Sequence, residues 1–232
     1  RVLNLPDFAS YADFLSCADG EAERLELISA VTTNVTSFFR EQHHFHQLTA
    51  SVLPPLMARA QAGGRIRLWS AACSSGEEPY SLAATVLGLC PEVQHYDVRI
   101  LATDIDRKMI EKTRRGIYPV DAAQGLAPDV ARRLFVGPRS GDEVQISPEA
   151  RALVQCNALN LQDKWPFKGP FDVILCRNVV IYFDKPTQER LWQRFVDILS
   201  PGGILMIGHS ERVTGPALTA FIADGMTTYR RR

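Results

Sequence analysis

The sequence of 232 residues has no excess of charge of either sign. It contains 26 lysine and arginine residues and 26 aspartate and glutamate residues, so the formal net charge is zero. A strongly basic surface, which attracts nucleic acids and anionic membranes, is therefore not expected. Nor does any apolar run approach the roughly 20 residues that cross a bilayer. We expect neither nucleic-acid binding nor insertion into a membrane.

The sequence also lacks most short motifs that announce a known chemistry. Its five cysteines form no Cys-x-x-Cys pair, and we expect reduced, buried thiols in a cytoplasmic protein. A nucleophile elbow, a Walker phosphate loop and an HExxH zinc motif are all missing. His43 and His46 are spaced to share a helix face, but no acidic or cysteine partner stands at metal-binding spacing, so no metal is predicted.

From residue 65 onward, apolar strand-like runs alternate with helical patterns. This alternation predicts an α/β fold with a parallel, doubly wound sheet. Strands are expected at 65–73, 96–105, 171–183, 204–210 and 226–232, and helices at 79–90, 106–117 and 188–199.

Residues 1–64 are expected to form a helical N-terminal domain, and residues 65–232 the α/β domain. One helix is predicted over 22–31 and a second over 32–60, with Thr36 or Ser37 capping the second. A segment at about 132–158 is rich in short strands and turns, and we expect it to form a small antiparallel β-subdomain inserted into the α/β domain.

The loop after the first strand contains a single glycine, Gly76, followed by Glu77 and Glu78. A dinucleotide site needs several glycines for close approach to a pyrophosphate, and two carboxylates would repel phosphates. The same two carboxylates would attract a cationic ligand without phosphate, such as S-adenosylmethionine. Alternatively, the two glutamates only complement the helix dipole in a first turn.

Polar residues follow the other two strands. Asp104 ends the second strand, where an acid commonly binds ribose hydroxyls, and Asp106 is placed to cap the next helix. Arg177, Asn178 and Tyr182 follow the third strand and are expected to face a transferred methyl group. A solvated turn is the simpler alternative for Arg177 and Asn178, and also for Asn160, which we place near the adenine.

The blocks "NVTSFFRE", "GEEPYS", "ILATDID", "NALNL", "CRNVVIYF" and "GHSE" occur in this order between about Leu25 and Tyr229. In combination they closely resemble the CheR family, the chemotaxis receptor glutamate methyltransferases. The resemblance implies a Rossmann-like S-adenosylmethionine-binding fold with a helical N-terminal domain and a small β-subdomain. The cofactor-binding residues it implies are Asn34, Thr36, Arg40, Glu77, Asp104, Asn160, Leu161, Arg177 and Asn178.

Two assignments stay open: which glutamate contacts the cofactor, and which residue holds the accepting carboxylate. The motif does not separate Glu77 from Glu78, and we favour Glu77 as the residue that contacts the cofactor. Arg177 and Tyr182 are our candidates for holding the carboxylate that accepts the methyl group.

The resemblance also implies a reaction and a partner. Family members transfer a methyl group from S-adenosylmethionine to glutamate carboxylates in the cytoplasmic domain of methyl-accepting chemotaxis receptors. The hairpin turn at 136–143 is slightly shorter than in members that bind a receptor tether peptide, so we expect tether independence. The alternatives are a methyltransferase of the same fold with another acceptor, and an adaptor that binds the cofactor without turnover.

Overall fold

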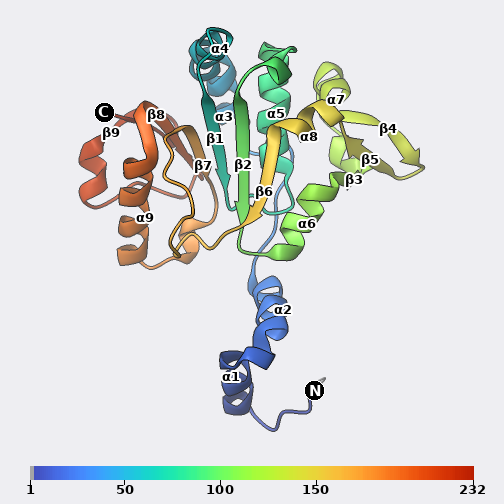
Figure 1. The fold of residues 1–232 in the computed structure, drawn as a ribbon, viewed down its shortest axis with the longest axis vertical. Coiled ribbons are helices and arrows are strands. Elements are labelled where there is room, and N and C mark those ends of the chain that lie inside the picture. Colours follow the sequence, from blue (N-terminus) through green and yellow to red (C-terminus); the bar gives the residue numbers. More distant parts are fainter. Residues whose placement is uncertain (1–2) are drawn as a thin grey trace.

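A central sheet of seven strands organises the molecule (Figure 1). The computed structural model describes residues 3–232, apart from the side chains of residues 138–140. The strand order is β6-β2-β1-β7-β8-β10-β9; the first five strands are parallel, β10 pairs antiparallel with β8, and β9 pairs antiparallel with β10. The predicted α/β class is therefore confirmed. The strands are β1 (Ile66–Ala71), β2 (Val98–Asp104), β6 (Val154–Ala158), β7 (Phe171–Cys176), β8 (Leu199–Ile207), β9 (Phe221–Gly225) and β10 (Thr228–Arg231).

Two apolar cores cover the faces of this sheet. On one face, side chains of α5 and of the helices before β1 pack against Leu68 and Val173. On the other, α9 packs Phe195 against Trp69. Strand β7 is buried at every residue, as expected for a central parallel strand covered on both faces. The helices beside the sheet are α5 (Glu77–Leu89), α6 (Arg107–Arg115), α8 (Pro148–Leu153) and α9 (Lys185–Ile198).

The second predicted helix begins ten residues later than expected. Residues 32–41 are not helical, and the helical run comprises α3 (Gln42–Gln47), a π-helical turn (Leu48–Val52) and α4 (Leu53–Gln61). Neither Thr36 nor Ser37 is a cap, so that expectation was wrong. Phe39 and Glu41 adopt left-handed backbone angles, with φ of 55° and 57°, which no helix accommodates.

The helices before β1 fall into two groups. Phe45 and Leu53, from α3 and α4, belong to the main apolar core. In contrast, α1 (Phe8–Ser16) and α2 (Glu21–Val31) bury no side chain and project from the body as a stalk (Figure 1). Residues 3–61 thus contribute partly to the α/β core, and the boundary at residue 64 stays a prediction.

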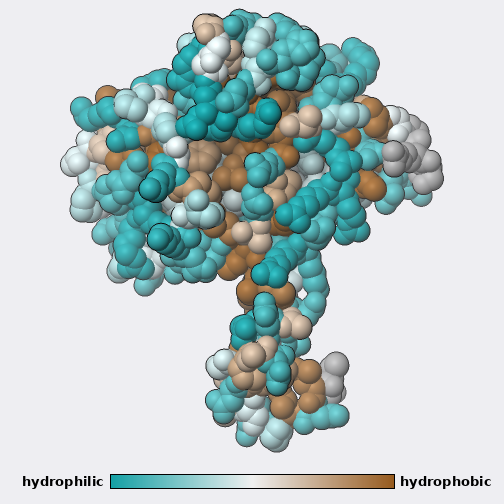
Figure 2. Space-filling view, in the orientation of Figure 1, coloured by the Kyte–Doolittle hydropathy of each residue, from teal (hydrophilic) through white to brown (hydrophobic). Residues whose placement is uncertain are grey.

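Apolar surface extends from the middle of the body onto the neck of the stalk (Figure 2). Val31, the last residue of α2, and Val35, in the segment that joins α2 to the body, are 70% and 75% exposed. Within residues 3–232, no helix combines the length and apolar character needed to cross a bilayer.

A separate three-stranded antiparallel sheet has the order β3-β5-β4. It is formed by β3 (Ile117–Pro119), β4 (Phe135–Ser140) and β5 (Glu143–Ile146), with α7 (Pro128–Leu134) between β3 and β4. The predicted segment 132–158 overlaps it only in part. That prediction missed β3 and included α8 and β6, and β6 pairs in parallel with β2 in the main sheet. Only one residue of β6 is fully buried, so this strand lacked the apolar pattern of its neighbours.

Candidate cofactor-binding and active site

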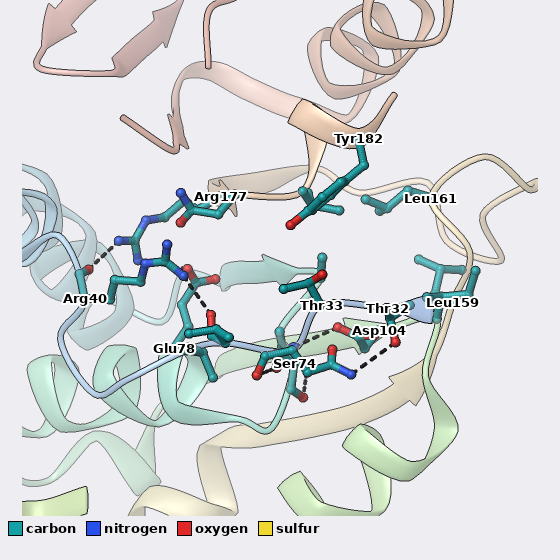
Figure 3. A pocket seen from close by; sticks show the side chains of 18 of the residues that line it. Thr32, Thr33, Arg40, Ser74, Glu78, Asp104, Leu159, Leu161, Arg177 and Tyr182 are labelled. Atoms are coloured by element: carbon teal, nitrogen blue, oxygen red, sulfur yellow. Dashed lines mark hydrogen bonds and ion pairs between the residues drawn. The ribbon is translucent and has the colours of Figure 1, made fainter. Parts of the chain in front are cut away.

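A cavity of about 360 Å³ lies beyond the carboxyl ends of β1, β2 and β7 (Figure 3). Its size falls within the range of small-molecule sites, about 300–1,000 Å³. Its position is where parallel sheets bind ligands. Five stretches of chain contribute to the wall: residues 31–45, 72–78, 104–105, 159–162 and 177–183.

Nine of the ten predicted site residues line this cavity. Although they come from four distant parts of the sequence, the fold brings them together: Asn34, Thr36, Arg40, Asp104, Asn160, Leu161, Arg177, Asn178 and Tyr182. Glu77 is the exception.

The two adjacent glutamates face different surroundings. Ser75 donates to the Glu77 carboxylate at 2.7 Å, and Glu77 is not among the residues that line the cavity. Glu78 does line it, and accepts hydrogen bonds from Ser70 at 2.6 Å and from Arg177 at 2.9 Å. Successive helical residues point about 100° apart, so only one of the pair faces the cavity. The lining of the cavity therefore favours Glu78 over Glu77, and which of the two contacts the cofactor stays a prediction.

Gly76 is needed for its backbone conformation and for close packing. Its φ is 99°, and a Cβ there would lie 2.7 Å from the hydroxyl oxygen of Tyr118 and 2.7 Å from Thr113. It does not line the cavity, whereas Ala72, Cys73 and Ser74 of the same loop do. The lone glycine therefore serves the turn and its packing.

Asp104 is buried at the end of β2 with its carboxylate fixed by the backbone. One oxygen accepts from the Ser74 N–H at 2.7 Å and the other from the Asp106 N–H at 2.9 Å. Burial raises the pKa of Asp104, and these hydrogen bonds partly counter the rise. Asp106 caps α6 through the Lys108 N–H, as predicted, and also accepts from Asn34 at 3.1 Å.

Arg177 lies beside Glu78 and Arg40, at the end of the cavity away from Asp104 (Figure 3). It donates to Glu78 at 2.9 Å, forms an ion pair with Glu41 at 3.3 Å and donates to the carbonyl oxygen of Arg40. Only 2% of its side chain is exposed. A buried ion pair of this kind is stable only while all partners remain, because each charge has left water.

Glu41 is a residue that sequence reasoning missed. Burial raises its pKa, but the charge of Arg177 and hydrogen bonds from His209 and Asn178 outweigh that effect and lower it to about 2. Glu41 is therefore ionised at neutral pH. The only local signal for it was its position directly after Arg40 in the "FFRE" block.

Glu41 also supplies the acidic neighbour that we had expected the histidines to lack. Glu41, His43 and His44 present ligand atoms within 4.8 Å of one another, whereas the predicted pair was His43 and His46. However, the Glu41 oxygen facing His44 is the one that pairs with Arg177. Two positive charges about 4 Å apart repel by roughly 4 kcal/mol at an effective dielectric constant of 20, so this cluster fits a metal cation poorly.

An extended strap, residues 32–37, borders the cavity. It is fastened by the bond between Asn34 and Asp106 and by one from the Ser74 hydroxyl to the Asn34 carbonyl at 3.3 Å. Opposite the strap, the ring of Tyr182 projects toward the cavity (Figure 3), and this residue is 61% exposed. The cavity is thus bordered by two segments that carry exposed side chains.

Three non-glycine residues with left-handed backbone angles line the cavity: Ala72, Ser74 and Asn178. Such conformations cost about 1–3 kcal/mol each and persist where the surroundings fix them. In Ser74 the strained backbone directs its N–H at Asp104. The strain is therefore coupled to the position of a predicted ligand-binding carboxylate.

Comparison with known proteins gives this arrangement a family. Residues 34–229 match the model of the CheR methyltransferase SAM-binding domain. A probable chemotaxis protein methyltransferase of Rhizobium etli is 50% identical, with 99% of this chain and 87% of that protein covered. The chemotaxis protein methyltransferase of Salmonella typhimurium is 41% identical (99% and 77% covered), and chemotaxis protein methyltransferase 2 of Pseudomonas aeruginosa is 40% identical (91% and 74% covered). The chain belongs to the CheR family of S-adenosylmethionine-dependent methyltransferases.

Proposed function

We propose that this enzyme transfers the methyl group of S-adenosylmethionine to glutamate side-chain carboxylates in the cytoplasmic domain of chemotaxis receptors. The products are glutamyl methyl esters and S-adenosylhomocysteine, and the role is sensory adaptation in the cytoplasm. The observation that carries the proposal is the convergence of Asp104, Glu78 and Arg177 on one cavity in a chain of this family.

The charges around the cavity support a definite orientation of the cofactor. Asp104 suits the ribose hydroxyls, and Leu159 and Leu161 offer apolar surface to the adenine beside Asn160. At the other end, Glu78 and Arg40 suit the ammonium and carboxylate groups of the methionine part. Thr36 and Asn178 complete that end of the cavity.

The proposed methyl transfer does not need acid–base catalysis. A glutamate carboxylate is already ionised at pH 7, so methyl transfer needs no general base. The enzyme must instead align the accepting oxygen with the methyl carbon and sulfur and exclude water.

Tyr182 is the better of our two candidates for orienting the acceptor. It is exposed at the mouth of the cavity, and its hydroxyl has no hydrogen-bond partner among the described residues. Arg177 already directs all three of its nitrogens at Glu41, Glu78 and the Arg40 carbonyl. We therefore assign Arg177 to fixing the acidic wall rather than to holding the acceptor.

The Glu78→Gln variant should bind S-adenosylmethionine about tenfold more weakly, because a charged partner of the ammonium group contributes about 1.5–3 kcal/mol. Glu77→Gln, one residue earlier, is the matched control and should bind normally. Isothermal titration calorimetry measures both. Equal losses in the two variants would remove Glu78 from the cofactor site.

The acceptor is tested directly with radiolabelled S-adenosylmethionine and a purified receptor cytoplasmic domain. We expect incorporated label to be released by mild base, as methyl esters are, and to be lost when the methylated glutamates are replaced by alanine. Base-stable label, or turnover only on another acceptor, would contradict the glutamate assignment while leaving the methyltransferase activity intact.

We further propose that the enzyme acts without a receptor tether peptide. Adding a peptide strand requires a free row of backbone N–H groups on a sheet edge. Both outer strands of the small sheet contain a proline, Pro119 in β3 and Pro138 in β4, and proline lacks the N–H. In the radiolabel assay, receptors with and without their C-terminal tail should be methylated at equal rates.

A further inference from the structure

Glu211 is a buried carboxylate that the roles above do not use. It lies four residues after the end of β8 and is 4% exposed. Among the described residues no lysine, arginine or histidine pairs with its carboxylate. Its negative charge must therefore be balanced by other groups.

Five backbone N–H groups converge on this carboxylate. Val179, Val180 and Ile181 donate to Oε1 at 3.0, 2.7 and 3.3 Å. Asn178 and Gly208 donate to Oε2 at 3.1 and 2.6 Å. Consecutive N–H groups that point inward form a concave anion site, and here the anion belongs to the chain itself.

Four of those five donors are consecutive residues in the loop after β7. Asn178 and Val179 line the cofactor cavity, and Tyr182, which also lines it, follows directly. Asn178 has a φ of 57°, in the left-handed region, which asparagine adopts more readily than most other non-glycine residues. The Glu211 carboxylate is placed to hold it, because it accepts the Asn178 N–H and the three that follow.

The loop is also held from the side of β8. A Cβ on Gly208 would lie 2.7 Å from the Asn178 side-chain nitrogen, 2.8 Å from its backbone nitrogen and 2.9 Å from Glu211 Oε2. The loops that follow β7 and β8 are therefore in close contact at this point, with the carboxylate between them. Little room is left for the loop to adopt another path while the carboxylate is present.

We infer that Glu211 is a positioning residue for the cofactor site: its carboxylate fixes residues 178–181 and so keeps Asn178, Val179 and Tyr182 in the cavity wall. The inference does not depend on which acceptor is methylated, since cofactor binding alone reports on it. A merely structural carboxylate would affect the stability of the fold and leave the affinity of the folded protein for cofactor unchanged.

The test compares Glu211→Gln with Asp172→Asn. Asp172 is also a buried carboxylate, but it lies near the start of β7, where Arg59, the Arg67 N–H and Ser200 donate to it. It does not line the cavity. Thermal unfolding and calorimetric titration with S-adenosylhomocysteine are measured on both variants and on the wild type.

We expect both variants to lose stability, but only Glu211→Gln to lose affinity, by about tenfold, the loss equivalent to roughly one net hydrogen bond. An amide at residue 211 turns an N–H donor toward N–H donors, so the loop must move. Normal affinity in Glu211→Gln, or an equal loss in Asp172→Asn, overturns the inference.

Glu211→Asp covers the case in which Glu211→Gln does not fold. The aspartate keeps the charge on a shorter side chain, so the five N–H groups cannot all be reached. We expect the dissociation constant to rise about threefold, which corresponds to less free energy than one net hydrogen bond contributes. Wild-type affinity in a folded Glu211→Asp protein counts against the inference.

Discussion

Replacing Asp104 with alanine should weaken the binding of S-adenosylmethionine about 100-fold, because two hydrogen bonds from ribose hydroxyls to a charged group contribute about 1.5–3 kcal/mol each and are not fully additive. The carboxylate is already oriented by the Ser74 and Asp106 N–H groups. The Asp104 carboxylate is therefore already oriented to accept hydrogen bonds from the ribose when the cofactor binds.

Calorimetric titration measures this change, with Asp97→Ala as the control. Asp97 lies just before the start of β2, at the opposite end of the strand, and pairs with Arg67 at the surface. The Asp97→Ala variant should bind cofactor with wild-type affinity. Unchanged affinity in Asp104→Ala would reject the ribose role and with it the proposed orientation of the cofactor.

The Arg177→Met variant should lose about 3–5 kcal/mol of unfolding free energy, the usual cost of removing one partner from a buried ion pair. Glu41 and Glu78 would both be left buried without their cation. Urea unfolding at pH 7 measures the loss. A second change, Glu41→Gln, should restore part of it by removing one uncompensated charge, which a double-mutant cycle reports.

The same variant should change the pH dependence of stability. The folded-state pKa of Glu41 is lowered to about 2 from an ordinary value of 4.5. A depressed carboxyl pKa stabilises the fold above pH 4.5, and this contribution disappears as the pH falls toward 2. Without Arg177 the pKa of Glu41 should rise, so the stability curve between pH 4.5 and 2 should flatten. An equally steep curve would mean that Arg177 does not set the ionisation of Glu41.

The sequence was sufficient to predict the site wherever a residue follows a parallel strand. Asp104 and Arg177 come directly at or after the ends of β2 and β7, and the ends of parallel strands meet at one edge of the sheet. Asn34 and Arg40 had no such geometric basis. Their assignment rested on the resemblance to a family.

What could not be predicted depends on contacts between distant residues. The helix expected over 32–60 begins only at Gln42, and the Phe39 N–H before it donates to the Ser81 hydroxyl of α5, 42 positions away. The choice between Glu77 and Glu78 depends on the rotation of α5 relative to the sheet. Glu41 gains its importance from Arg177, Asn178 and His209, all more than 130 positions later.

The covalent link between the stalk and the rest of the chain has one further consequence. The peptide that leads from α2 into the body is the strap whose side chains form part of the cofactor enclosure. Because Glu26 of α2 also pairs with Lys108 of α6, movement of the two projecting helices reaches the body through both the strap and α6. We therefore expect a bound cofactor, which would contact the strap, to limit how far these two helices can swing.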